Sequence, residues 1–243
     1  MSPLYPAGTL SYSASRRSLR GVAFIPTSAP NLEYWFKADS LALSDGAAVA
    51  TWADSSGNTR DISQGTGANQ PVYKTGILNG QPVVRFDGSN DTLARAPEAA
   101  NKSAAFSMFV VVVPRALGNF GAMASAAGSW VFYKWNDQNI RLSAGTALTT
   151  TSAAVIGTPM VYGLTLVTGS RNIYANGASI GSDSGAFTAN STGSLVIGAD
   201  AAAGTFFYNG DVAEFLYYSR VVDSTERSSV TSYLGSKYGI TVA

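Results

Sequence analysis

Apolar and polar residues alternate along most of this chain in short runs, a pattern typical of β-strands. Between the runs, Gly, Pro, Asn and Asp cluster at intervals of roughly 8–12 residues, as expected for turns. The pattern predicts strands at 32–38, 49–53, 71–74, 82–86, 92–95, 105–113, 130–135, 138–143, 160–168, 171–175, 178–181, 194–198 and 211–219. The sequence therefore predicts an all-β fold, an antiparallel jelly-roll β-sandwich.

The last predicted strand, 211–219, is apolar on both faces, so we expect it inside a sheet that is covered on both sides. A helical pattern follows it. Asp223 and Glu226 have the spacing of a capping box, and Gly239 is a stop signal. The apolar residues between them recur at helical spacing, at Val230, Tyr233, Leu234 and Tyr238. This pattern predicts a short C-terminal helix that lies on the sandwich.

Residues 1–30 lack this alternation. They contain four Pro, three Arg and no acid, giving +3, whereas the remainder carries 13 bases and 15 acids, giving −2. Pro disfavours both sheet interiors and long helices, so we expect an extended arm over 1–30 and one domain over 31–243. The arm is either a disordered tail or a segment that orders on a partner. In the second case the contact residues are Arg16, Arg17, Arg20, Val22, Phe24 and Ile25.

The amino-acid composition argues against several classes of function. The chain has no Cys and no His, which excludes thiol nucleophiles, disulfides and imidazole bases and disfavours zinc sites. Its formal net charge is +1, so we expect no nucleic-acid binding. The longest apolar run, 108–113, is far below the about 20 residues that cross a bilayer, so we expect no membrane insertion.

Four segments resemble one family in the order in which that family carries them. They are WADSSGN (52–58), LNGQPVVRFDGSNDTLA (78–94), IYANGASIG (173–181) and FYNGDVAEFLYYSRVVDSTERSSVTSYLGSKYG (207–239). Over about 31–240 the chain is similar to the concanavalin A-like, laminin G-type jelly-roll domains of bacterial surface proteins and phage virion proteins. The resemblance implies a concanavalin A-like sandwich, a fold that serves lectins, hydrolases, adhesins and structural proteins.

Hydrolase chemistry depends on a pair of carboxyl groups, about 5–5.5 Å apart in retaining glycosidases. The chain has four Glu, none with a carboxylate two residues away on a strand: Glu33, Glu98, Glu214 and Glu226. Glu214 alone lies in the middle of a strand, and we expect it to pair with an Arg such as Arg85 or Arg220. The sequence on these grounds predicts a chain that is not an enzyme.

Calcium is the candidate cofactor, since laminin G-type domains often hold one calcium ion through loop Asp side chains and carbonyl oxygens. Such a site needs six to eight oxygen ligands. The candidate ligands lie in polar turns, at Asp54, Asp87, Asn90 and Asp91. The alternative is that each side chain caps its own turn.

A glycan site needs an aromatic face beside amide and carboxylate groups. Tyr133, Trp135, Asn136 and Asp137 supply these groups on one predicted hairpin. Strand alternation places Tyr133 and Trp135 on one face of the strand and Trp130 and Phe132 on the other face. The alternative is that core packing explains the aromatic residues.

The start of the chain has no continuous apolar segment of the secretory kind, although the resemblance implies an extracellular context. Virion proteins meet both conditions, because they assemble in the host cytoplasm and act on the particle surface. The sequence thus predicts a non-enzymatic phage accessory protein, a capsid decoration or head-fibre protein held by its arm to other virion proteins, as a homo-oligomer. The alternatives are a tail receptor-binding or adhesion module, or a bacterial surface carbohydrate-binding protein, that recognises glycan.

Overall fold

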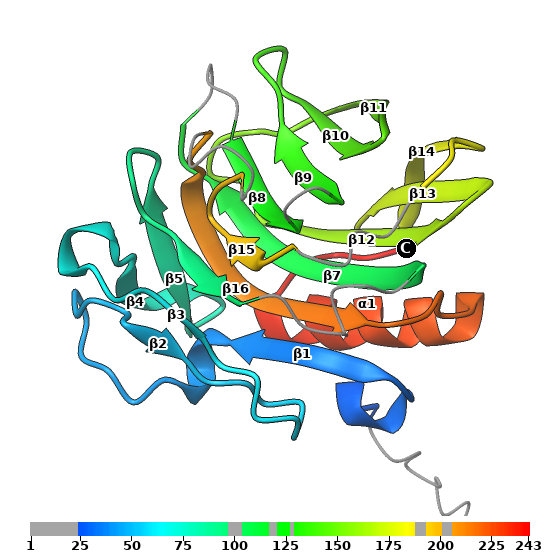
Figure 1. The fold of residues 1–243 in the computed structure, drawn as a ribbon. Helices are drawn as coiled ribbons and strands as arrows, with labels where there is room; N and C mark the ends of the chain where they lie inside the picture. Colours follow the sequence, from blue (N-terminus) through cyan, green and yellow to red (C-terminus); the bar gives the residue numbers. More distant parts are fainter. Residues whose placement is uncertain (1–23, 97–103, 117–120, 127–128, 188–192, 201–205) are drawn as a thin grey trace, which may run out of the picture.

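The computed structural model describes residues 24–96, 104–116, 121–126, 129–187, 193–200 and 206–243. Two antiparallel sheets face each other, and one helix, α1 (Ser224–Tyr238), lies on the outside (Figure 1). Within the described residues, the short 3-10 helix η1 (Pro26–Ser28) precedes the first strand, and two more, η2 (Ala38–Ser40) and η3 (Gly67–Asn69), lie between strands. The prediction of an all-β sandwich with a short C-terminal helix is confirmed.

The first sheet has eight strands, and β16 lies in the middle of it. In spatial order they are β14 (Ala178–Asp183), β13 (Ser170–Ala175), β12 (Met160–Val167), β7 (Ala105–Pro114), β16 (Asn209–Tyr218), β5 (Gln81–Asp87) and β4 (Val72–Leu78), with β1 (Leu32–Lys37) also paired to β16. β5 pairs with the start of β16 and β1 with its end, so one long strand is shared by three neighbours.

The second sheet also has eight strands. In spatial order they are β11 (Thr146–Ala153), β10 (Asn139–Ala144), β9 (Trp130–Lys134), β8 (Gly121–Ala126), β15 (Leu195–Ile197), β6 (Leu93–Arg95), β3 (Ile62–Ser63) and β2 (Thr51–Trp52). The alternation of β9 places Trp130 and Phe132 in the core between the sheets and leaves Tyr133 outside it. The face of this sheet that points away from the core is therefore where polar and aromatic groups gather.

A second apolar layer, here called the outer core, lies between the first sheet and α1. It joins strand residues such as Phe109 and Leu216 to the helix residues Val230 and Leu234. Both halves of the predicted capping box are present at Asp223, and Gly239 ends the helix with a φ of 67°. Within the described residues no helix is long and apolar enough to cross a bilayer.

Of the predicted arm, the structure describes only 24–30, and this part packs on the body. Pro26 is buried, and its carbonyl accepts a hydrogen bond from the Tyr218 hydroxyl at 3.2 Å. Phe24 packs against the outer core, whereas Ile25 is 53% exposed. The predicted contact residues Arg16, Arg17, Arg20 and Val22 lie outside the described residues.

Candidate functional site

An aromatic and charged cluster lies where β9 turns into β10, on the outer side of the second sheet. The Tyr133 and Trp135 rings meet edge to face with centroids 5.9 Å apart. Tyr133 is buried, while Trp135 keeps 36% of its surface exposed. Burial raises the pKa of the Tyr133 hydroxyl, so it stays a neutral donor at physiological pH. The cluster thus offers solvent one supported indole ring.

Charged and amide groups border that ring. The Arg141 guanidinium lies 5.0 Å from the Trp135 centroid and donates to Asp137 at 2.6 Å. Asp137 also accepts the Asn139 amide at 3.0 Å, which fixes the turn. Asn136 is exposed, and its side-chain amide makes no hydrogen bond with the described residues. The four residues predicted from the sequence therefore do lie together at one end of the hairpin.

Arg141 is the member of this cluster that the sequence analysis missed. It reaches the site because β9 and β10 pair antiparallel and place Arg141 directly opposite Tyr133. The signal was present in the chain, since a strand that follows the Asn-Asp turn must return a residue to that position. Its guanidinium holds the indole in place through a cation–π contact and neutralises Asp137.

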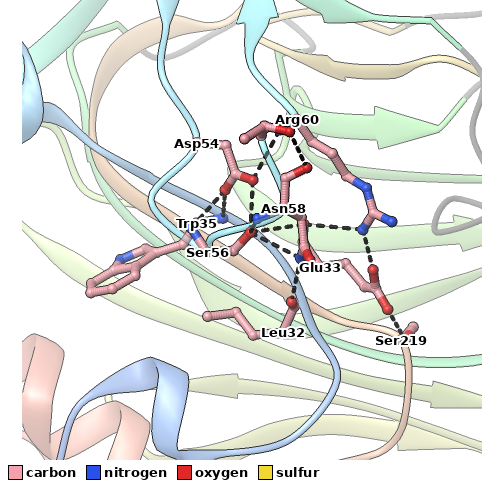
Figure 2. Close-up of polar contacts among 9 residues, drawn as sticks. Leu32, Glu33, Trp35, Asp54, Ser56, Asn58, Arg60 and Ser219 are labelled. Carbon is pink, nitrogen blue, oxygen red and sulfur yellow. Dashed lines mark hydrogen bonds and ion pairs between the residues drawn. The ribbon is translucent and has the colours of Figure 1, made fainter.

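Asp54, a predicted calcium ligand, lies in the loop between β2 and β3, and both its oxygens already accept hydrogen bonds (Figure 2). Oδ1 accepts the Trp35 and Ser56 amides at 3.0 and 2.9 Å. Oδ2 accepts the Ser56 hydroxyl at 2.7 Å and the Arg60 amide at 3.1 Å. The geometry is that of a carboxylate that organises a loop.

The same loop covers the free edge of β1. The Asn58 amide donates to the Leu32 carbonyl at 2.8 Å, and the Ser55 amide donates to the Trp35 carbonyl at 2.8 Å (Figure 2 shows the first). Arg60 forms an ion pair with Glu33 on that strand. The Trp35 amide and the Leu32, Glu33 and Trp35 carbonyls of β1 are thus bonded by residues of the WADSSGN motif and the residues after it rather than by another strand.

Asp87, Asn90 and Asp91 lie in one turn between β5 and β6. Asp87 Oδ1 accepts the Ser89 amide at 2.7 Å, and Asp91 Oδ2 accepts the Asp87 amide at 2.9 Å. The four candidate calcium ligands are therefore divided between two turns. Among the described residues, no group of three or more acidic side chains is placed to hold a metal ion.

Asp91 gives a test of this turn. Burial raises the pKa of its carboxyl from 3.8 to about 6, so ionisation costs the folded state stability as pH rises through that window. Asp91→Asn keeps an acceptor oxygen and removes this cost. We expect the variant to be about 1–3 kcal/mol more stable than the parent at pH 7, with the difference shrinking towards pH 4. Thermal melts of both proteins between these pH values measure it.

Asp45 supplies a control of opposite sign. Hydrogen bonds from the Lys74 ammonium and the Thr75 amide lower the pKa of its carboxyl. Its ionised form therefore favours the folded state, and that contribution is lost as pH falls. Asp45→Asn should be less stable than the parent at pH 7 and approach it at low pH. A loss of stability in Asp91→Asn at pH 7 would contradict the expected burial cost.

Glu214, the mid-strand carboxylate, does not pair with Arg85 or Arg220 as the sequence led us to expect. Arg85 binds Asp211, and Arg220 binds Glu226. Glu214 is fully buried and pairs with Lys237 of α1 at 2.7 Å. The partner comes from the helix because α1 lies over β16, a tertiary contact that strand alternation does not reveal.

Comparisons with known proteins find similar folds among solved structures. No family model matches the sequence, and no curated protein matches it. Among solved structures, the fold is similar to domain 4 of AbnA, a GH43 extracellular arabinanase from Geobacillus stearothermophilus, in complex with arabinotriose. The TM-score is 0.63 at 13% identity, over 83% of this chain and 98% of that one.

Two other similarities cover parts of longer chains. A Trypanosoma rangeli sialidase matches with a TM-score of 0.62 and 14% identity, over 88% of this chain and 34% of that one. The binding domain of Paraclostridial Mosquitocidal Protein 1 matches with a TM-score of 0.60 and 15% identity, over 84% and 52%. The chain spans about a third of the sialidase. At these identities the likeness shows a shared β-sandwich fold.

These similarities correct one prediction. The sequence predicted a chain that is not an enzyme, because none of its four Glu has a carboxylate two residues away on a strand. The solved structures with this fold include a sialidase and a domain of an arabinanase, both named as enzymes. The exclusion is therefore wrong as a conclusion about this chain, because the fold occurs within enzymes that act on glycans.

Proposed function

We propose that this chain is a carbohydrate-binding module whose ligand site is the β9–β10 hairpin end. The observation that carries the proposal is Trp135, a large aromatic side chain that is partly exposed to solvent. Contacts with Tyr133 and Arg141 fix its position. A flat ring of this kind packs against the apolar face of a sugar, while the neighbouring groups bond its hydroxyls.

The polar groups around Trp135 suit a neutral sugar. Asp137 accepts hydrogen bonds, the Asn136 amide both donates and accepts, and Arg141 donates. The ion pair between Arg141 and Asp137 cancels their charges, so the site has no surplus charge to select an ionic ligand. Hydroxyl groups, which donate and accept at once, match this mixture.

The comparisons support the proposal at the level of fold. Domain 4 of the Geobacillus arabinanase was solved with arabinotriose bound, and this chain covers 98% of it. The mosquitocidal structure is likewise named a binding domain. A carbohydrate-binding role agrees with the alternative reading of the sequence, an adhesion module or a surface protein that recognises glycan.

The location of the chain and its mode of attachment stay predictions from the sequence. The sequence predicts a homo-oligomer on a phage particle. Residues 1–30 attach it to capsid or tail proteins. None of the solved structures named above is a phage protein. We therefore propose glycan recognition as the function and keep the virion as the predicted location in which that recognition serves adhesion.

The proposal predicts that Trp135→Ala loses glycan binding. We expect at least a tenfold weaker affinity, about 1.4 kcal/mol, because the indole supplies the apolar contact. Titration calorimetry measures it, with arabinotriose and a panel of neutral and sialylated oligosaccharides as probes. The melting temperature should not fall by more than a few degrees, since Trp135 is partly exposed.

Tyr174→Ala is the matched control, because Tyr174 is a partly exposed aromatic residue on β13 of the other sheet. It should bind as the parent does. If no member of the panel binds the parent, or if both variants lose affinity equally, glycan recognition by the hairpin end is wrong.

A further inference from the structure

A groove of about 440 Å³ lies on the outer face of the first sheet, away from the hairpin site. No residue of α1 lines it. Leu78 and Val113 belong to both the outer core and the groove, so the groove continues the apolar layer past the part that the helix covers. Its volume lies in the range of sites that hold small ligands or short peptide segments.

The floor of the groove is a row of paired residues across three strands. Asp211 of β16 lies opposite Arg85 of β5 on one side and opposite Val113 of β7 on the other. Asp211 accepts Arg85 Nε at 2.6 Å and Nη2 at 2.9 Å. Asp211 has 2% of its side chain exposed and Arg85 has 24%. The buried carboxylate thus fixes a guanidinium whose remaining nitrogen, Nη1, makes no hydrogen bond with the described residues.

A second guanidinium stands at the rim. Arg115 is exposed, and only its backbone amide is hydrogen-bonded, to the Asn209 carbonyl at 3.1 Å. Its side chain makes no ion pair or hydrogen bond within the described chain. Two arginines and one buried carboxylate therefore line the groove, which leaves it with a surplus positive charge and several N–H donors.

Exposed apolar side chains form the banks. Ile77, near the β4–β5 turn, is 38% exposed, and Ile156, in the turn before β12, is 50% exposed. Pro114 and Pro159 also line the groove. Branched side chains on two banks suit short apolar side chains on both sides of an extended backbone. Exposed apolar surface that gathers around a groove marks a binding site.

We propose that this groove binds the carboxyl terminus of a partner polypeptide whose last residues are apolar. The terminal carboxylate pairs with Arg115 and with Nη1 of Arg85, since a guanidinium binds carboxylates through paired hydrogen bonds. The last apolar side chains lie between Ile77 and Ile156. Capture of a terminal carboxylate is a recurring mode of peptide recognition. This inference is independent of glycan binding, which uses the other sheet.

Fluorescence anisotropy with the full chain tests the proposal. The probes are labelled hexapeptides that end in Val, Ile, Leu or Phe, each made as the free acid and as the carboxamide. We expect at least one acid to bind, and its amide to bind at least tenfold more weakly. Arg115→Gln should lower the affinity for the acid to that for the amide, and Ile156→Ser should weaken both.

Arg227→Gln and Val221→Ser are the matched controls, because neither residue lines the groove. Both should bind as the parent does, and all four variants should melt near the parent. Failure of every acid peptide to bind, or equal binding of acid and amide, overturns the proposal. Octanoate is the third probe: if it binds with the same dependence on Arg115 while no peptide does, the ligand is a lipid-type acid and the peptide assignment is wrong.

Discussion

Replacing Glu214 with alanine is expected to lower the free energy of unfolding by about 3–5 kcal/mol, because the change removes a fully buried carboxylate that accepts three hydrogen bonds, two of them from buried donors. Glu214 Oε1 accepts the Trp35 indole N–H at 2.5 Å. Oε2 accepts the Lys237 ammonium at 2.7 Å and the Tyr238 hydroxyl at 2.8 Å. One carboxylate therefore joins β1, β16 and α1, and alanine leaves three donors without it.

Urea unfolding measures this loss. Glu214→Gln keeps an acceptor for one donor and should fall between alanine and the parent. Asp39→Asn is the control, because Asp39 also contacts Lys237, at 3.0 Å, from a more exposed position, and should cost less than about 1 kcal/mol. An alanine variant as stable as the Asp39 control would mean that the carboxylate does not hold α1 in place.

The second large effect is expected for Arg171→Ala, again a loss of about 3–5 kcal/mol. Arg171 is 1% exposed. Its Nε donates to Asp183 at 2.6 Å, and its Nη1 donates to the Ala144 and Thr146 carbonyls at 3.0 and 2.9 Å. Arg171 and Asp183 belong to the first sheet, and the two carbonyls belong to the β10–β11 turn of the second. The guanidinium thus ties the two sheets together at one side.

Lysine cannot replace this fork of donors, so Arg171→Lys should recover little of the stability. Gly185→Ala tests the same contact without changing Arg171. The added methyl group would lie 2.2 Å from Arg171 Nη2 and should displace the guanidinium. Arg227→Ala is the control, because the Arg227 side chain has no ion pair within the described residues and makes a cation–π contact with Tyr174. Thermal and urea unfolding of the four variants decide the matter. Equal stability of Arg171→Ala and Arg227→Ala would contradict the role given to Arg171.

The strands and the helix that the sequence predicted are those with strong local patterns. β16 is apolar on both faces, and α1 carries a capping box and a stop glycine. β3, which is two residues long, was missed, and so were β8 (GAMASA) and β11 (TALTTTSA). β8 has few residues of high β propensity, and β11 is a run of small and hydroxyl side chains. These two strands are fixed by pairing with their neighbours, which no local pattern shows.

The site residues that the sequence predicted correctly are likewise those that a local pattern determines. The sequence placed Tyr133 and Trp135 on one face because alternation is local, and the structure brings them together. Arg141 joins them across a hairpin, so only the register of the pairing reveals it. Glu214 was assigned the wrong partner because Lys237 approaches from a separate layer. The groove around Arg85 and Arg115 was missed for this reason too, since its banks come from turns far apart in the chain.

The loop that covers β1 also protects part of that strand's edge against strand addition. An uncovered strand edge is a template on which another molecule can add, and repeated addition leads to fibres. Here the Trp35 amide and carbonyl and the Leu32 carbonyl on that edge are bonded by Asp54, Ser55 and Asn58 of the same molecule. The covered part of β1 therefore cannot serve as a template on which a second copy of the chain adds as a strand.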